Sequence, residues 1–193
     1  MRTTARALAV LALAACSGRD AAPRPADSGA STTAAAKIGA CWGRPLIGEG
    51  GVGTVRVSRT IADLARTCVT HDTAFSLGEG LAETAKVVRY DGHEIVAVIT
   101  GSRTGVISRV IVSDSAFHTA AGVGIGSTVG DLRKAYGTVC PLGREERVGV
   151  RVRGLAGVSF GVRSSDPTPS DTAHVSEIWI YEPGLDAGAR CGG

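Results

Sequence analysis

The sequence predicts an α+β fold in which a helix followed by a three-strand antiparallel meander occurs twice. All strands are expected in one sheet, with the helices on one face of it. Two observations lead to this prediction. Residues 57–66 match residues 125–134 without gaps, so that Thr, Asp and Leu coincide. Each copy is then followed by three segments with strand patterning, separated by turn residues.

Each matching segment is expected to begin a short helix, near residues 60–68 and 128–136. Both carry Thr-x-x-Asp before an apolar residue, as Thr60 with Asp63 and Thr128 with Asp131. A threonine hydroxyl at this position accepts from the free amides of the first turn, and the aspartate suits the positive end of the helix. These four residues are therefore the predicted helix caps, and the glycine after residue 136 is expected to end the second helix.

Three strands are expected after each helix. They are residues 86–90, 94–100 and 106–113 in the first repeat, and 147–153, 158–163 and 175–181 in the second. An Asp-Gly pair at 91–92 marks the first hairpin. Valines alternate with arginines and a glycine along 147–153, which is the two-residue period of a strand with one buried side.

A glycine-rich segment starts the second helix. It covers residues 123–132 and continues to Tyr136 and Gly137, and a weaker copy of it occurs at residues 55–64. Together with the strand order, it resembles the beta-lactamase-inhibitor-protein-like fold and the SmpA/OmlA outer-membrane lipoproteins. That resemblance implies a binding protein, not an enzyme.

The N-terminus has the pattern of an export signal. Arg2 and Arg6 precede an apolar run, residues 7–15, which is too short to span a membrane. The run ends in Leu-Ala-Ala before Cys16, which resembles the lipobox of bacterial lipoproteins. It implies cleavage after residue 15 and lipidation of Cys16, so that a lipid anchor would hold the protein on a membrane. The alternative is an ordinary secretory signal with a chance cysteine. Ser17, where Asp would signal retention at the inner membrane, favours the outer membrane facing the periplasm.

The domain organisation follows from composition. Residues 16–36 contain no large apolar side chain and are expected to form a disordered linker. The two repeats would then occupy residues 37–114 and 115–193.

Four more cysteines are expected to form disulfides, because their number is even and the protein is exported. They are Cys41, Cys68, Cys140 and Cys191. Three pairings are possible, and we favour Cys41–Cys68 with Cys140–Cys191 because each bridge then belongs to one repeat. A metal site is the alternative, but no CxxC or HxxxH spacing occurs, so no metal is predicted.

Charge and motifs exclude several classes of function. The net charge is +3, and loss of Arg2 and Arg6 leaves the mature chain nearly neutral, so a nucleic-acid partner is not expected. The glycine cluster at 122–128 lacks the Gly-Lys-Ser/Thr ending of a nucleotide-binding loop. There is no Gly-x-Ser-x-Gly elbow. His71 and His118 are expected in loops, and His93 after a hairpin turn and His174 near a strand start are both expected to be solvated. Glu79 and Glu83 are better explained as a solvated pair. We predict no catalytic residue and no cofactor.

A surface is the preferred functional feature. If the isoleucines of strand 175–181 face the helices, Trp179 and Tyr181 face away, and Arg147, Arg151 and Arg153 of strand 147–153 share that face. These residue types dominate binding hot spots. The alternative is that Trp179 packs in the core and the arginines only solvate an edge.

The sequence therefore predicts a non-catalytic envelope lipoprotein that binds another protein through its sheet. A small-molecule or cell-wall ligand held in a glycine-rich cleft, around residues 48–53 and 122–127, is the alternative. A hydrolase is the third candidate.

Overall fold

The computed structural model describes residues 41, 43–78, 80–90, 92–99, 105–144 and 147–184. The predicted signal peptide, the linker, the lipidation site Cys16 and the predicted disulfide partner Cys191 lie outside these ranges. Within them, no helix is long and apolar enough to cross a membrane.

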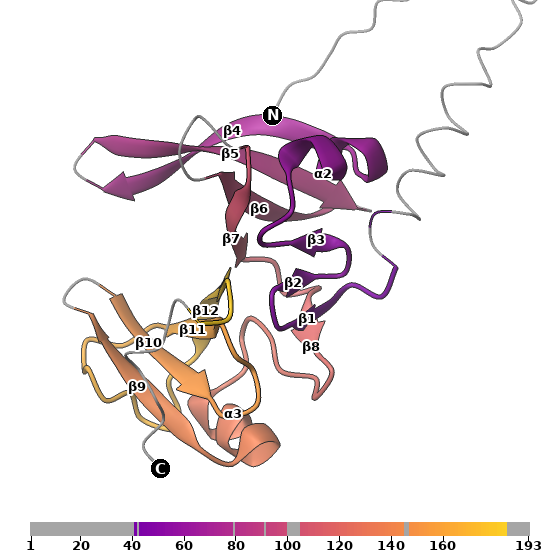
Figure 1. Cartoon of the computed structure of the whole chain (residues 1–193). Coiled ribbons are helices and arrows are strands. Elements are labelled where there is room, and N and C mark those ends of the chain that lie inside the picture. Colours follow the sequence, from indigo (N-terminus) through magenta and orange to yellow (C-terminus); the bar gives the residue numbers. More distant parts are fainter. Residues whose placement is uncertain are drawn as a thin grey trace, which may run out of the picture.

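An eight-stranded antiparallel sheet forms the body of the protein (Figure 1). Its strands, in spatial order, are β4 (Thr70–Gly78), β5 (Leu81–Tyr90), β6 (His93–Ile99), β7 (Ile107–Val112), β12 (Val175–Tyr181), β11 (Val158–Val162), β10 (Arg147–Val152) and β9 (Val139–Arg144). Each half is a meander of strands consecutive in the chain. The halves meet where β7 pairs with β12, with Val112 opposite Ile178.

A second, four-stranded sheet lies beside the first. It contains β1 (Leu46–Gly48), β2 (Gly51–Val52), β3 (Val55–Arg56) and β8 (His118–Thr119), in the order β3-β2-β1-β8. Gly51 lies in β2 opposite Arg56 of β3, and glycine is required there because a Cβ atom would lie 2.2 Å from the carbonyl oxygen of Val55. Figure 1 shows this small sheet between the two helices.

Two short helices have the predicted starts. In α2 (Ile61–Thr67), the Thr60 hydroxyl accepts from the Asp63 amide at 3.1 Å. In α3 (Val129–Tyr136), Thr128 and Asp131 form a reciprocal capping box, in which the Asp131 carboxylate also accepts from the Thr128 amide at 3.0 Å. Gly137, with φ of 74°, ends α3. These caps explain why helices form here although each is only about two turns long.

The main core lies on one face of the large sheet, which we call the inner face. Leu64 of α2 and Leu132 of α3 pack in the same buried cluster as Phe160, Ile178 and Ile180 of the sheet. The small sheet contributes Ile47, Val52 and Val55 to that cluster. Both helices and the small sheet therefore cover the same side of the eight strands.

The predicted fold class is wrong. The chain is mostly β, with two sheets and, among the described residues, two helices of seven and eight residues. Four strands of the large sheet follow each helix, where three were predicted, because β4 and β9 were not recognised in the sequence. β4 begins with polar residues from Thr70 to Thr73, as an edge strand can, and therefore shows no buried alternation. β9 contains Pro141, which reads as a strand breaker but is tolerated at an edge.

The small sheet was missed because strands of two or three residues are too short to show a period. Two histidine positions change with the missed strands. His71 lies in β4 and His118 in β8, where loops were expected.

Candidate functional site

The face of the large sheet opposite the helices, which we call the outer face, is the candidate site. Ile178 and Ile180 are fully buried in the main core. Because side chains alternate along a strand, Trp179 and Tyr181 point to the outer face, where both are half-buried. On the neighbouring strand, Arg109 lies directly opposite Tyr181.

Arg109 is the centre of an aromatic–arginine cluster on this face, formed by Phe75, Glu83, Arg109 and Tyr181. Its guanidinium carbon lies 5.5 Å from the centroid of the Tyr181 ring and 5.6 Å from that of Phe75. A cation held between two aromatic rings is stabilised by both ring faces. The cluster therefore extends across the first five strands of the large sheet, from the edge strand β4 to β12.

The ion pair inside this cluster is incomplete. Glu83 Oε2 lies 3.6 Å from Arg109 Nη2, which is longer than the roughly 2.7–2.9 Å of a charge-assisted hydrogen bond. Glu83 Oε2 and Arg109 Nε are both buried and neither has a hydrogen-bond partner. Buried polar atoms without hydrogen-bond partners cost free energy, so these two atoms reduce the stabilisation that the ion pair provides.

A small hydrophobic cluster lies next to the charged one. Ala85, Val98 and Ile111 are buried together, and Phe75, Val96 and Trp179 pack against them. Trp179 therefore packs in this outer cluster and not in the main core. All six residues belong to the large sheet itself.

The predicted arginines occupy different places. Arg151 is half-buried and donates from Nε to the Ser159 hydroxyl at 3.2 Å, and Ser159 lies opposite Trp179. Arg153 is exposed just after the end of β10. Arg147 is in β10, but its side chain lies outside what the structure describes.

Sequence reasoning missed Phe75 and Arg109. Glu83 was expected on a solvated face with Glu79, but it lies in β5 with a buried Oε2 atom beside Arg109, and Glu79 lies outside the described residues. The only signal for Arg109 was a single charged residue inside a mostly apolar strand, Ile-Ser-Arg-Val-Ile-Val. Phe75 could not be placed because β4 was not recognised.

The predicted Cys41–Cys68 disulfide is confirmed, with the two Cα atoms 4.8 Å apart. Cys140 is also disulfide-bonded, and its predicted partner Cys191 lies outside the described residues, so that pairing stays a prediction.

Within the described ranges, no group of three or more His, Cys, Asp or Glu residues could hold a metal ion. His93 and Asp114 form a histidine–carboxylate pair, with His93 Nδ1 3.0 Å from Asp114 Oδ2. Partial burial works to raise the pKa of Asp114, but the Ala116 amide and His93 outweigh it and lower the pKa. Asp114 also accepts from the Glu94 amide at 3.3 Å. The pair thus ties the turn after β7 to the start of β6.

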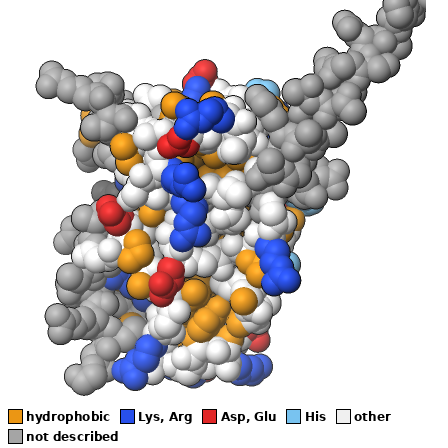
Figure 2. All heavy atoms as spheres, turned by 45° about the vertical axis from the view of Figure 1, so that its right-hand side comes forward, with side chains coloured by type: hydrophobic (Ala, Val, Ile, Leu, Met, Phe, Trp, Pro, Cys, Tyr) orange, Lys and Arg blue, Asp and Glu red, His pale blue; other side chains and the backbone are white. Residues whose placement is uncertain are grey.

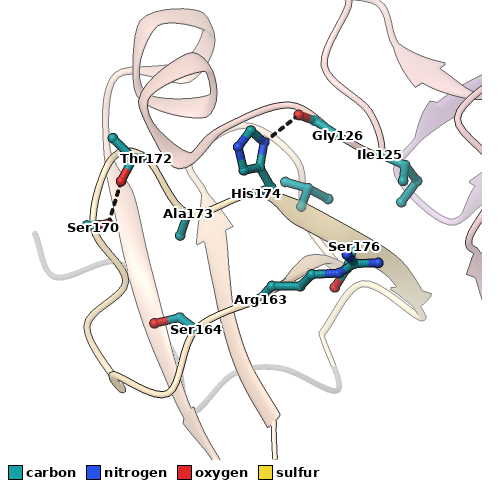
Figure 3. A pocket seen from close by; sticks show the side chains of 10 residues that line it. Ile125, Gly126, Arg163, Ser164, Ser170, Thr172, Ala173, His174 and Ser176 are labelled. Atoms are coloured by element: carbon teal, nitrogen blue, oxygen red, sulfur yellow. Dashed lines mark hydrogen bonds between the residues drawn. The ribbon is translucent and has the colours of Figure 1, made fainter.

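A pocket of about 530 Å³ lies where the chain passes between β11 and β12 (Figure 3). It is lined by residues from 125–126, 163–164 and 170–176. The glycine-rich segment 122–127 therefore borders a pocket, but residues 48–53, the other side of the predicted cleft, do not line it.

The sequence profile of a family described as "Protein of unknown function (DUF1131)" matches residues 41–157, more than half of the chain. This chain belongs to the DUF1131 family. The DUF1131 match contains Phe75, Glu83, Arg109 and Arg151 and ends before β11, so Trp179 and Tyr181 lie beyond it. A family of unknown function is compatible with the expected bacterial lipoprotein. The resemblance to the beta-lactamase-inhibitor-protein-like fold and to the SmpA/OmlA lipoproteins stays a prediction.

One solved structure similar to this DUF1131 chain is the crystal structure of the uncharacterized protein yfeY from Escherichia coli. It has 21% sequence identity and a TM-score of 0.48, and the alignment covers 70% of this chain and 99% of that chain. No curated protein matches the chain.

The side of this DUF1131 protein turned forward in Figure 2 carries a row of basic side chains with acidic side chains between them. Hydrophobic side chains are scattered on either side of this row. The charge on this face is therefore mixed in sign.

Proposed function

We propose that this protein is a non-catalytic, lipid-anchored protein of the bacterial cell envelope that binds another envelope protein through its outer face. The observation that carries the proposal is the aromatic–arginine cluster, where Arg109 lies between the rings of Phe75 and Tyr181. Tyrosine, tryptophan and arginine are the residue types that contribute most to binding energy at protein interfaces.

The composition of the outer face favours a protein partner. Its hydrophobic cluster is built from the sheet alone, and Trp179 and Tyr181 present half-buried rings beside it. An antiparallel sheet with helices on one side commonly leaves the other side for solvent or a partner. Rings of this kind bury large areas with little loss of side-chain entropy.

Charge restricts the chemistry of that partner. The outer face and its margin carry Arg109, Arg151 and the exposed Arg153, against the carboxylates of Glu83 and Glu177. We infer that the partner offers an apolar segment with at least one carboxylate. That carboxylate would lie over the arginine side of the face and contribute to orientation and association rate.

In-cell photo-crosslinking tests the proposed surface. Trp179 is replaced by a photo-crosslinking phenylalanine analogue in the full-length, exported protein, and Lys134 on α3 is replaced in a matched variant. We expect a discrete crosslinked protein from position 179 only. Arg153→Glu, combined with the probe at 179, should reduce that product severalfold. Equal products from both positions, or none from 179 in the native envelope, would contradict the proposal.

The anchor is tested separately, with Cys16. Lipidation requires the cysteine thiol, so Cys16→Ser should abolish palmitate labelling and leave the precursor uncleaved. Labelling that persists in Cys16→Ser would contradict lipidation at this residue. Ser17→Asp tests the destination, because it should move the protein from the outer to the inner membrane fraction.

A further inference from the structure

The pocket at the β11–β12 junction has the chemistry of a polar ligand site. It lies at a bulge, where the pairing of the two strands shifts between Gly161 and Val162. The four hydroxyl side chains of Ser164, Ser170, Thr172 and Ser176 line it, together with Arg163 and His174. Its volume, about 530 Å³, is in the roughly 300–1,000 Å³ range of small-molecule sites.

His174 is held in one orientation by the backbone. Its Nδ1 atom is 2.9 Å from the carbonyl oxygen of Gly126. The dashed line between these two residues in Figure 3 marks this hydrogen bond. A carbonyl oxygen can only accept, so Nδ1 carries the hydrogen and Nε2 is left to interact with other groups. The backbone also links the two basic residues, because the Arg163 amide donates to the His174 carbonyl at 3.0 Å.

The positive charge of Arg163 is not compensated nearby. Its side chain is exposed, and among the described residues it forms no ion pair. The lining contains neither aspartate nor glutamate. The two carboxylates of the adjoining loop are engaged elsewhere: Asp166 accepts from the Thr168 amide at 2.7 Å, and Asp171 pairs with Arg133 at 3.0 Å.

The hydroxyls are arranged by the same loop. The hydroxyl oxygens of Ser170 and Thr172 lie 3.0 Å apart. The Ser164 hydroxyl donates to the carbonyl oxygen of Asp166 at 3.2 Å. Each hydroxyl both donates and accepts, so each keeps capacity for a further bond. Figure 3 shows Arg163 and Ser164 on one side of the pocket, and Thr172, Ala173 and His174 on the other.

We propose that this pocket binds a small hydroxylated, sugar-like molecule that carries one oxyanion group. The guanidinium of Arg163 would bind the carboxylate or phosphate, since its fork of donors matches the oxygens of both. The hydroxyls and His174 Nε2 would bind the hydroxyl groups of the ligand. The pocket shares no residue with the aromatic–arginine cluster of the outer face.

NMR titration of the folded, oxidised protein tests this assignment, with glucose 6-phosphate, glucuronate, glucose and inorganic phosphate as probes. Saturable shifts of the amides of residues 126, 163–164 and 170–176 are expected with at least one of the two sugar anions. Comparison of these two distinguishes phosphate from carboxylate recognition. Glucose should bind at least roughly tenfold more weakly, as expected when a charged hydrogen-bond partner is lost.

Variants assign the effect to residues. Arg163→Gln should weaken binding of the sugar anion roughly tenfold or more, and Arg163→Lys by less, because it keeps the charge but loses the fork. Lys134→Gln removes the same charge from an exposed position of α3 and should change nothing. The melting temperature of each variant shows that it is folded. Shifts that do not saturate, binding unaffected by Arg163→Gln, or glucose binding as tightly as its phosphate would overturn the proposal.

Discussion

Loss of the Cys41–Cys68 disulfide should destabilise the protein strongly. The bond joins the segment before β1 to Cys68, the residue that ends α2, and its sequence separation is 27 residues. In the chain-entropy description, a closed loop of this length restricts the unfolded chain by about 12 cal/mol/K, or about 3.5 kcal/mol at 25 °C. For a domain of this size, each kcal/mol corresponds to about 2–4 °C, so the melting temperature should fall by roughly 7–14 °C.

Packing must be separated from the cross-link in this measurement. Both cysteines are almost fully buried, with 1% and 2% of their surfaces exposed, so alanine substitution also removes core contacts. Cys68→Ala alone already breaks the bond, and adding Cys41→Ala removes only further packing. We therefore expect the single variant to account for most of the loss seen in the double variant.

The assay is urea unfolding followed by circular dichroism, with Cys140→Ala as a variant that breaks a different disulfide. If Cys68→Ala lowers the free energy of unfolding by less than about 1 kcal/mol, the reasoning is refuted, since the disulfide would then not constrain the unfolded chain. A double variant far less stable than the single one would also refute it, because packing would then dominate.

Three further predictions concern the folded module. Thr128→Ala should lower the free energy of unfolding by about 1 kcal/mol and lower the melting temperature. Thr60→Ala should lower the free energy of unfolding by less, because only Thr128 belongs to a reciprocal capping box. A larger loss for Thr60→Ala than for Thr128→Ala would contradict the role of the box. Phe160→Ala should cost about 3–5 kcal/mol in urea unfolding, since Phe160 is 0% exposed, whereas Leu81→Ala at a 62% exposed position should stay within about 0.5 kcal/mol. The Thr128 amide lowers the pKa of Asp131 below 3.8, so its stabilising contribution is present above that pH and lost as the pH falls through the lowered pKa. The melting temperature should thus fall more steeply below pH 3.8 in the native protein than in Asp131→Asn, and parallel curves would contradict the link.

Local signals were predictable and long-range ones were not. The starts of both helices depend on side chains within one turn, so Thr60 and Thr128 were recognised from the sequence. The fold class was wrong because edge strands need neither alternation nor strong strand formers. β4 and β9 are the two edges of the large sheet, and both were missed.

The candidate site shows the same limit. Alternation along β12 was enough to place Trp179 and Tyr181 opposite the buried isoleucines. The contact between Arg109 and Phe75 joins β7 to β4, which are not neighbours in the sheet, so it required the strand order. The Arg163–His174 pocket depends on a bulge, which leaves no pattern in the sequence.

The pairing of β7 with β12 also bears on how the chain folds. Within each half of the large sheet, every strand pairs with its neighbour in the chain, so only short loops must close. Val112 and Ile178 come from distant parts of the chain, and the entropy of bringing them together must be overcome in one step. We expect the two halves to assemble locally first, and their union to limit the folding rate. If the two halves separate between β7 and β12, the unpaired edges of these two central strands become exposed. Exposed strand edges are templates for aggregation.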